Sequence, residues 1–338
     1  MAKLNPRRHV SITDVAERAG VSITTVSHVL SGRRPVSEAT RTRVQGIIAE
    51  LGYEPNQLAR GLRLQRTRTI ALIIPNITNP FYPWIARGLQ DAVSAAGYHV
   101  VVSSTDAVPG TERSVINEMI TRRVDGIAFA TYHNDTADLD AAVKVGIPVV
   151  LLGGRTPSAG IDVVSADDLA GGEIATRYLL GRGYRRIGFI TGPQRKGPPA
   201  NRVIGCRRAL KQAGIPAATS LIVREEFSRE GGARGMAQLL GLSQPPDAVL
   251  CTNDVVAVGA LQTALGRGLR VPEDVAVMGF DDIEIASVTA PKLTTVAVRP
   301  LEQGEAIGRV LLNRLNDLAP AAPRRILFDP AVVPRESA

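Results

Sequence analysis

From residue 69 onward, short apolar runs alternate with longer stretches whose apolar positions recur at helical spacing. The runs fall into two series, 70–74, 100–102, 126–129 and 149–152, then 187–190, 222–223, 248–250 and 275–278. Uninterrupted apolar runs of this length are typical of strands that are buried on both faces of a parallel sheet. The pattern therefore predicts an α/β body.

Helical stretches separate the apolar runs in both series. They lie near 84–96, 111–122 and 138–145, and then near 171–182, 202–213, 231–240 and 255–267. Repeated strand–helix units build a doubly wound parallel sheet with helices on both faces. Two series predict two such lobes, and ligands bind at the carboxyl ends of the strands in this architecture.

The first 55 residues have a different pattern, which predicts three short helices. Three segments, 11–20, 22–32 and 37–52, each open on a serine that can cap a helix and close on a glycine that can end one. The tight turn between the first two segments predicts a helix-turn-helix, whose second helix can enter the major groove of DNA. A purely structural three-helix domain is the alternative.

Within the second helix, Val26, Val29 and Leu30 are expected to pack inward, because they recur at helical spacing. The opposite face carries Ile23, Thr24, Ser27 and His28. Polar side chains on an outward face could either be solvated or contact a partner. Their arrangement alone does not separate the two interpretations.

The distribution of charge favours the DNA-binding interpretation. Residues 1–68 hold 12 Lys and Arg against 5 Asp and Glu, whereas the other 270 residues hold 28 against 27. The net charge of +8 therefore resides almost entirely in the head. A basic segment next to a nearly neutral body indicates a polyanionic partner for that segment.

A short segment between head and body is the third unit of the chain. Residues 57–64 are helix-forming but too few to be stable alone, so a partner must order them. We therefore expect a helix-turn-helix domain at 1–55, a hinge helix and linker at 56–68, and a two-lobed body at 69–338.

Several protein classes are excluded by what the sequence does not contain. No apolar run has membrane-spanning length, and no apolar signal core follows the basic N-terminus, so a cytoplasmic protein is expected. Cys206 and Cys251 fit a reducing compartment, and the histidines lack metal-ligand spacing. No nucleophile elbow or P-loop is found. We expect no metal, no cofactor and no enzymatic activity.

Short motifs in both parts of the chain resemble the LacI/GalR family of transcription regulators. In the head they are 12–16, 20–22, 25–30, 53–56 and 59–62, and in the body 75–76, 80–82, 253–254, 279–282 and 293–296. The likeness covers nearly the whole chain. It implies an all-α helix-turn-helix head, a periplasmic-binding-protein-like body, double-stranded operator DNA and a small-molecule effector as partners, and a homodimer. A tetramer stays possible, although no leucine heptads follow Asp329.

The resemblance implies roles for individual residues of the head. Ile23, Thr24 and His28 would reach base edges, and Ser22, Thr25 and Ser27 would hold phosphates. The implied DNA contacts also include Arg34, Ala59 and Leu62. Leu62 would be an apolar wedge that enters the minor groove and bends the duplex.

The resemblance also implies an effector site in the body. Its expected contacts are Asn76, Phe81, Tyr82, Lys196, Arg202, Phe227, Asn253 and Asp281. Aromatic, carboxylate and guanidinium groups suit a polyhydroxylated or polar ring ligand. A sugar or sugar derivative is preferred, because Lys196 and Pro198 differ from what the purine-sensing branch of the family needs. A purine effector and a solute-binding transport protein remain the alternatives.

The wedge interpretation predicts the effect of Leu62→Ala. Specific operator affinity should fall, because the variant cannot hold the central base step apart, while effector affinity and the folded body should be nearly unchanged. Titration of labelled operator, with effector binding as the control, measures both. An unaltered operator affinity would contradict the wedge.

Overall fold

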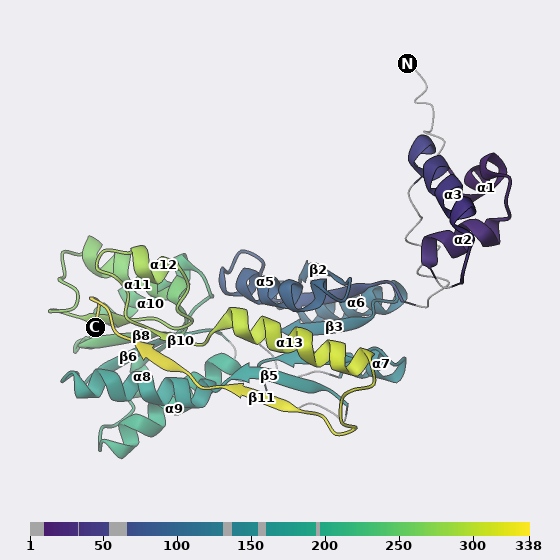
Figure 1. Cartoon of the computed structure of the whole chain (residues 1–338). Coiled ribbons are helices and arrows are strands. Elements are labelled where there is room, and N and C mark those ends of the chain that lie inside the picture. The colour runs from purple at the N-terminus through teal and green to yellow at the C-terminus, as the bar shows by residue number, and fades with distance from the viewer. Residues whose placement is uncertain (1–9, 33, 54–65, 131–136, 155–159, 194–196) are drawn as a thin grey trace. The chain divides into compact units, whose positions relative to one another are not determined.

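The computed structural model describes residues 10–32, 34–53, 66–130, 137–154, 160–193 and 197–338. The chain divides into two compact units between Thr67 and Arg68. Within its described residues, the first unit contains three helices, α1 (Ile12–Ala19), α2 (Ile23–Ser31) and α3 (Glu38–Leu51) (Figure 1). The predicted head of three short helices is confirmed.

Serine caps and glycine stops define the helices of the head. The side chains of Ser11, Ser22 and Ser37 each accept a backbone N–H in the first turn of their helix. Gly20, Gly32 and Gly52 end the helices in the left-handed conformation, which glycine adopts without a steric penalty. Both ends of each helix are therefore determined by residues at the helix ends themselves and not by tertiary packing.

The small core of the head is built from one face of each helix. Its buried members are Val15, Ala16, Ala19, Val26, Val44 and Tyr53. Val29 is half-buried against this cluster, but the prediction that Leu30 packs inward was wrong, because 40% of its surface is exposed. Leu30 lies in the last turn of α2, beyond the face that meets the core.

The first lobe of the second unit is a six-stranded parallel sheet with the order β11-β5-β4-β3-β1-β2. Its strands are β1 (Thr69–Ile74), β2 (His99–Ser104), β3 (Gly126–Ala130), β4 (Val149–Leu152), β5 (Asp162–Ala166) and β11 (Arg325–Phe328). The helices α5 (Phe81–Ser94) and α13 (Pro300–Leu315) cover one face. The other face is covered by α6 (Pro109–Thr121) and α7 (Leu139–Lys144).

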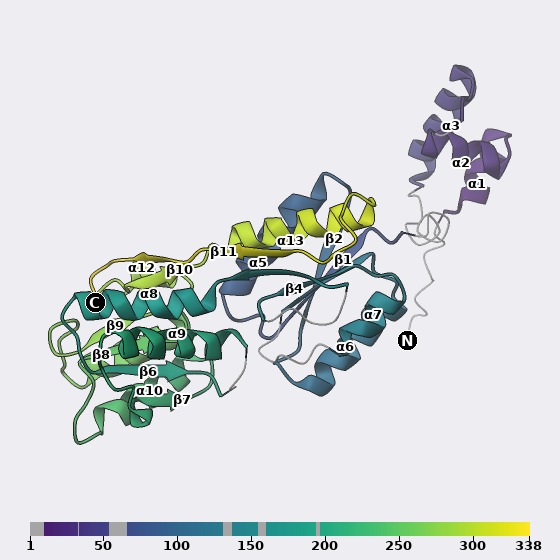
Figure 2. The ribbon, with the colours of Figure 1, turned by 90° about the horizontal axis from the view of Figure 1, so that it is seen from below.

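The second lobe is a four-stranded parallel sheet with the order β7-β6-β8-β9. Its strands are β6 (Ile187–Thr191), β7 (Ile222–Arg224), β8 (Ala248–Cys251) and β9 (Ala276–Met278). One face packs on α8 (Asp168–Gly181) and α9 (Pro198–Gln212), the other on α10 (Arg229–Leu240) and α11 (Asp254–Gly266) (Figure 2). The predicted pair of doubly wound lobes is confirmed.

The remaining elements complete both lobes. A 3-10 turn η1 (Thr219–Leu221) and helix α12 (Ile285–Val288) lie in the second lobe, where β10 (Thr295–Ala297) and β12 (Ala331–Val333) pair antiparallel. The chain passes between the lobes three times, from β5 to α8, from β10 to α13 and from β11 to β12. The sequence pattern did not predict β5, α13 or β11, so the return of the chain to the first lobe went unrecognised.

A buried carboxylate anchors this return. The guanidinium of Arg314 on α13 donates two hydrogen bonds to Asp162, at 2.8 and 3.0 Å, and the backbone N–H of Arg324 donates a third at 2.7 Å. Burial alone would raise the pKa of Asp162, but these bonds outweigh it and lower the pKa. The carboxylate therefore stays ionised and joins α13, β5 and the approach to β11.

Glycines allow three pairs of helices to cross in close contact. The pairs are α5 with α13, α8 with α9, and α10 with α11, and the glycines are Gly88 and Gly304, Gly172 and Gly205, and Gly232 and Gly259. A Cβ added at Gly172 would lie 2.0 Å from the carbonyl oxygen of Arg202, and one at Gly205 would lie 2.0 Å from that of Leu169. Because backbone atoms form these contacts, neither helix can yield by changing a rotamer.

Two glycines on α8 provide a matched test of this crossing. We expect Gly172→Ala to lower the free energy of unfolding of the body by roughly 1–3 kcal/mol, because α9 must move away. Gly181→Ala meets nothing within 4 Å and should be neutral, or stabilise by up to about 1 kcal/mol. Urea unfolding of both variants measures the difference. Equal stability of the two variants would contradict the close crossing.

Candidate functional site

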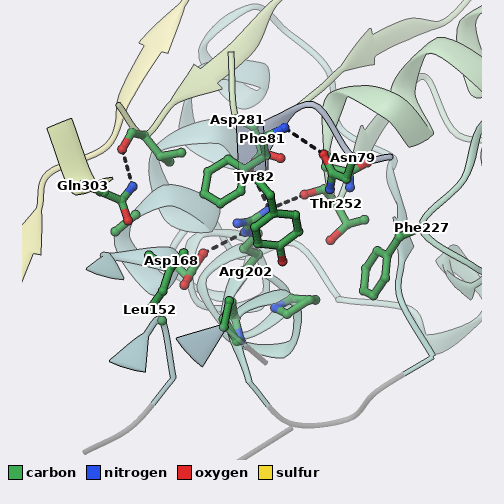
Figure 3. A pocket seen from close by; sticks show the side chains of 17 residues that line it. Asn79, Phe81, Tyr82, Leu152, Asp168, Arg202, Phe227, Thr252, Asp281 and Gln303 are labelled. Carbon is green, nitrogen blue, oxygen red and sulfur yellow. Dashed lines mark hydrogen bonds and ion pairs between the residues drawn. The ribbon is translucent and has the colours of Figure 1, made fainter. Parts of the chain in front are cut away.

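A pocket lies where the strands of the two lobes end. Its lining includes Asn79, Phe81 and Tyr82 after β1, Leu152 at the end of β4, Asp168 after β5, Arg202 on α9, Phe227 after β7, Thr252 and Asn253 after β8, and Asp281 after β9. Val298 and Gln303 line it from the second passage between the lobes. Carboxyl ends of parallel strands are the expected place for a ligand in such sheets. Figure 3 shows these side chains from close by.

Arg202 occupies the polar centre of the pocket. Its Nε donates to Asp168 Oδ1 at 2.8 Å, and its Nη1 lies 3.5 Å from Asp281 Oδ1 and donates to the Thr252 carbonyl. The guanidinium carbon lies 3.7 Å from the centroid of the Phe280 ring. All three charged side chains are at most 12% exposed. The guanidinium is therefore held by charge, hydrogen bonds and an aromatic face together.

Two carboxylates share this single guanidinium in a dry environment. Burial raises the pKa of Asp168, and the opposing charge of Arg202 only partly compensates. Burial also raises the pKa of Asp281 to about 7, opposed by Arg202 and assisted by the negative charge of Asp168. Asp281 is the carboxylate farther from the guanidinium, so it holds the proton more readily. The pair can accept hydrogen bonds at one residue and donate one at the other.

Buried Asp254 fixes the loop that carries Asp281. Its carboxylate accepts the backbone N–H of Ile283 at 2.9 Å and the hydroxyl of Thr295 at 2.5 Å. Asp281 itself has φ of 107°, a conformation that costs energy for a residue with a side chain. The preceding Asn253 caps α11, since its Oδ1 accepts the N–H of Val256 at 2.9 Å. The hydrogen bonds of Asp254 with Ile283 and Thr295 thus hold the loop in which Asp281 adopts this conformation.

Aromatic rings form the other surfaces of the pocket. Phe81 and Tyr82 meet edge to face, with centroids 5.3 Å apart and an interplanar angle of 84°. The side chain of Asn79 accepts the N–H of Phe81 at 3.0 Å and so fixes the start of α5. Phe227 lies to the right of Tyr82 in Figure 3, and its ring fills the space that a Cβ on Gly192 would need.

The head presents a separate surface along α2. Ser22 caps this helix, because its Oγ accepts the N–H of Thr25 at 3.1 Å. Ile23, Thr24 and Arg34 are exposed, and Ile23 leaves 47% of its surface open. The surface combines the start of a helix with exposed side chains along its first two turns.

Comparisons with known proteins match both units of the chain. The model of bacterial regulatory proteins of the lacI family matches residues 11–56, and that of the periplasmic binding protein-like domain matches 176–338. The regulator DegA of Bacillus subtilis (strain 168) and the ribose operon repressor of Escherichia coli (strain K12) are each 36% identical over 330 residues. Each alignment spans 97% of this chain, with 97% and 99% of the relative. This chain belongs to the lacI family.

Solved structures agree with this assignment. The lac repressor dimer bound to operator and the anti-inducer ONPF matches with a TM-score of 0.87 at 26% identity, over 98% of this chain and 99% of that one. The transcriptional regulator CelR in complex with cellobiose matches with a TM-score of 0.75 at 32% identity, over 97% and 100%. The lacI-family chain is thus a DNA-binding transcriptional regulator, and its relatives are regulators rather than enzymes.

Most of the predicted effector residues of this lacI-family chain line one pocket. They are Phe81, Tyr82, Arg202, Phe227, Asn253 and Asp281. Asn76 does not line it, because its Oδ1 accepts the N–H and the hydroxyl of Thr78, at 2.8 and 2.7 Å, and shapes a turn. Lys196 lies outside the described residues.

The predicted DNA contacts gather on the first turns of α2. Thr25, Ser27 and His28 are half-buried there, beside the exposed residues described above. Ala59 and Leu62 lie outside the described residues. The contacts of these residues with bases and phosphates stay predictions.

Sequence analysis missed several lining residues, above all Asp168. Asp168 follows β5, whose apolar core of Val163 and Val164 is too short to stand out as a strand. Gln303 lies on α13, and its Nε2 donates to the Val298 carbonyl at 2.6 Å. Recognition of the strand would have placed Asp168 at a carboxyl end, whereas nothing local marks Gln303.

The described residues contain neither a helix suited to span a bilayer nor a cluster suited to hold a metal ion. No helix there is both long and apolar enough to cross a bilayer. Within the same described ranges, His, Cys, Asp and Glu side chains do not gather in threes around a possible metal position.

The raised pKa of Asp281 predicts a pH dependence of stability. Between the pKa of an unfolded Asp, about 4, and the folded value of about 7, only the folded chain keeps the proton. The free energy of unfolding should therefore fall as pH rises through this window. Urea titrations at intervals of pH measure the slope, and Asp281→Asn should reduce it, leaving the part due to Asp168 and Asp254, whose pKa values are also raised.

Asp274 supplies the matched control. Its hydrogen bonds with Arg270 lower its pKa to about 2, so above about pH 5, where an unfolded Asp has also lost its proton, it is ionised in both states. Asp274→Asn should leave the slope above about pH 5 unchanged. If Asp281→Asn and the wild type gave the same slope, the buried proton would not be on Asp281.

Proposed function

We propose that this lacI-family regulator is a repressor whose affinity for operator DNA is set by a sugar or sugar derivative bound against Arg202. The observation that supports the effector class most directly is the Asp168–Arg202–Asp281 cluster between aromatic rings. Vicinal hydroxyls can donate to one carboxylate and accept from a guanidinium, while an aromatic ring covers the apolar face of the sugar.

Relatives support the same class of effector. Their names include the ribose operon repressor, CelR in complex with cellobiose, and a lacI-family regulator of Enterococcus faecium with bound ribose. The last structure matches this chain with a TM-score of 0.72 at 28% identity, over 80% of the chain. The descriptions of all three proteins include a saccharide, either ribose or cellobiose.

The route from pocket to DNA follows from the placement of the lining. Residues of both lobes line the pocket, so a ligand that contacts both favours one arrangement of the lobes over others. Segment 56–68, which joins the head to the body, can carry this preference to two heads in a dimer that reads a near-palindromic operator. His28 and Ile23 on α2 would then read bases, and Ser22, Thr25 and Ser27 would hold phosphates.

A crossed pair of variants tests the proposal. Operators are first selected from random duplex DNA, and sugars and nucleobases are screened for a rise in the unfolding temperature of the full-length chain. Phe227→Ala should weaken binding of the identified sugar about tenfold, because one aromatic face is lost, and leave effector-free operator affinity unchanged. His28→Ala should weaken operator binding roughly tenfold and leave sugar affinity unchanged. Fluorescence anisotropy and calorimetry measure the two affinities.

Each half of the proposal can fail by itself. Stabilisation by nucleobases and by no sugar would replace the effector class with a purine. No selected sequence above random DNA, with or without effector, would contradict regulation through an operator. A change of both affinities in each single variant would instead indicate loss of the folded protein, which the unfolding temperature detects.

A further inference from the structure

A second cavity opens at the surface of the second lobe, between α9 and β6. Its volume is about 270 Å³. The floor is formed by Ile187 and Phe189 of β6, the roof by Val203, Cys206 and Leu210 of α9, and one end by the connection to β7. Figure 2 shows α9 lying along β6. None of its lining residues belongs to the effector pocket.

The floor and roof of the cavity are apolar and buried. Ile187, Phe189, Val203, Cys206 and Leu210 are each at most 5% exposed, whereas Arg207, Pro216 and Ala217 are exposed, so the pocket has a buried apolar base and a side that is open to solvent. Burial raises the pKa of the Cys206 thiol, which is therefore a neutral wall group. A dry, apolar cavity of about 150 Å³ is sufficient for a benzene ring. The larger space here has room for a ring with a short substituent.

An apolar group would gain favourable contacts in this pocket. Its floor and roof are large apolar side chains, and each Å² of apolar surface removed from water is favourable by about 25 cal/mol. The connection to β7 adds Ile215, Pro216, Ala217 and Ala218 along one end. A guest with an apolar tail would cover these side chains.

The mouth of the cavity is positively charged. Arg185, Arg186 and Arg207 line it. Arg185 donates from Nη1 to the carbonyls of Leu180 and Tyr184, and Arg186 from Nε to that of Gln244. Among the residues that the structure describes, Arg207 is in no ion pair, whereas its neighbour Arg208 pairs with Glu173 at 3.8 Å. Asp247 partly offsets the charge by accepting the backbone N–H groups of Arg185 and Arg186.

We propose that this cavity binds a small monocarboxylate with a single ring or a branched hydrocarbon tail. The tail fills the space between α9 and β6, and the carboxylate meets the guanidinium of Arg207 at the mouth. The volume limits the tail to about one ring, and the three arginines select an anionic head. The site is separate from the effector pocket, so its occupancy does not depend on the sugar.

Calorimetric titration of the full-length chain tests the proposal. The probes are phenylacetate, cyclohexanecarboxylate and 3-methylbutanoate, with phenylacetamide as the neutral analogue of the first. We expect saturable binding of at least one acid, and phenylacetamide to bind about tenfold more weakly than phenylacetate. Failure of all three acids to bind would overturn the proposal.

Matched variants locate the binding. Ala217→Trp places a large ring at the mouth from an exposed position and should abolish binding, whereas Ala213→Trp, exposed on the same connection but outside the lining, should not. Arg207→Gln should weaken binding of the acid about tenfold and leave the amide unaffected, and Arg208→Gln should change neither.

Phe227→Ala distinguishes this cavity from the effector pocket. Binding that survives Ala217→Trp but is lost in Phe227→Ala would place the acid in the effector pocket and overturn the proposal. Binding that survives Phe227→Ala and is lost in Ala217→Trp supports it. Either result leaves the sugar-controlled repressor hypothesis untouched, because that rests on its own pair of variants.

Discussion

The buried contact of Arg202 with Asp168 and Asp281 is the constraint on which the rest of the effector pocket depends. Charges removed from water are tolerated only where geometry and additional hydrogen bonds compensate for lost hydration. Here α8 supplies one carboxylate, α9 the guanidinium and the loop after β9 the other carboxylate. Three segments of the second lobe must therefore keep a fixed arrangement. Any ligand that exchanges hydrogen bonds with this cluster meets a polar floor that is already organised.

The packing around the cluster fixes the positions of its three charged side chains. The glycine contacts between α8 and α9 involve Arg202 and Leu169. Arg202 is one member of the shorter ion pair, and Leu169 follows the other member, Asp168. Asp254 holds the third partner through the loop that follows β9. The first lobe contributes aromatic and amide groups, and Gln303 joins the pocket to the second passage between lobes. A ligand in this pocket would thus meet a rigid floor from the second lobe, side chains of the first lobe and a connecting segment at the same time.

Much of this could be predicted from the sequence, because apolar runs and capping residues act locally. All eight apolar runs are strands, and serine and glycine bound the three helices of the head. Six of the eight effector residues line one pocket, although family resemblance, more than pattern, selected them. Asp168 was missed because the apolar core of β5 is short, and β11 and α13 were missed because their places depend on the return of the chain to the first lobe. Asn76 does not line the pocket, because its side chain accepts the backbone N–H of Thr78 within the same turn.

One helix, α9, faces both cavities, and its packing determines how they can communicate. Its second turn carries Arg202, and this and the following turns cover the apolar space above β6. Coupling between two ligands requires that each prefer a different position of the shared element. The backbone contacts at Gly172 and Gly205 leave α9 no room to approach α8, and the ion pair with Asp168 resists its departure. A guest beneath α9 therefore stabilises the lobe that holds Arg202 without displacing it, and the two sites act nearly independently.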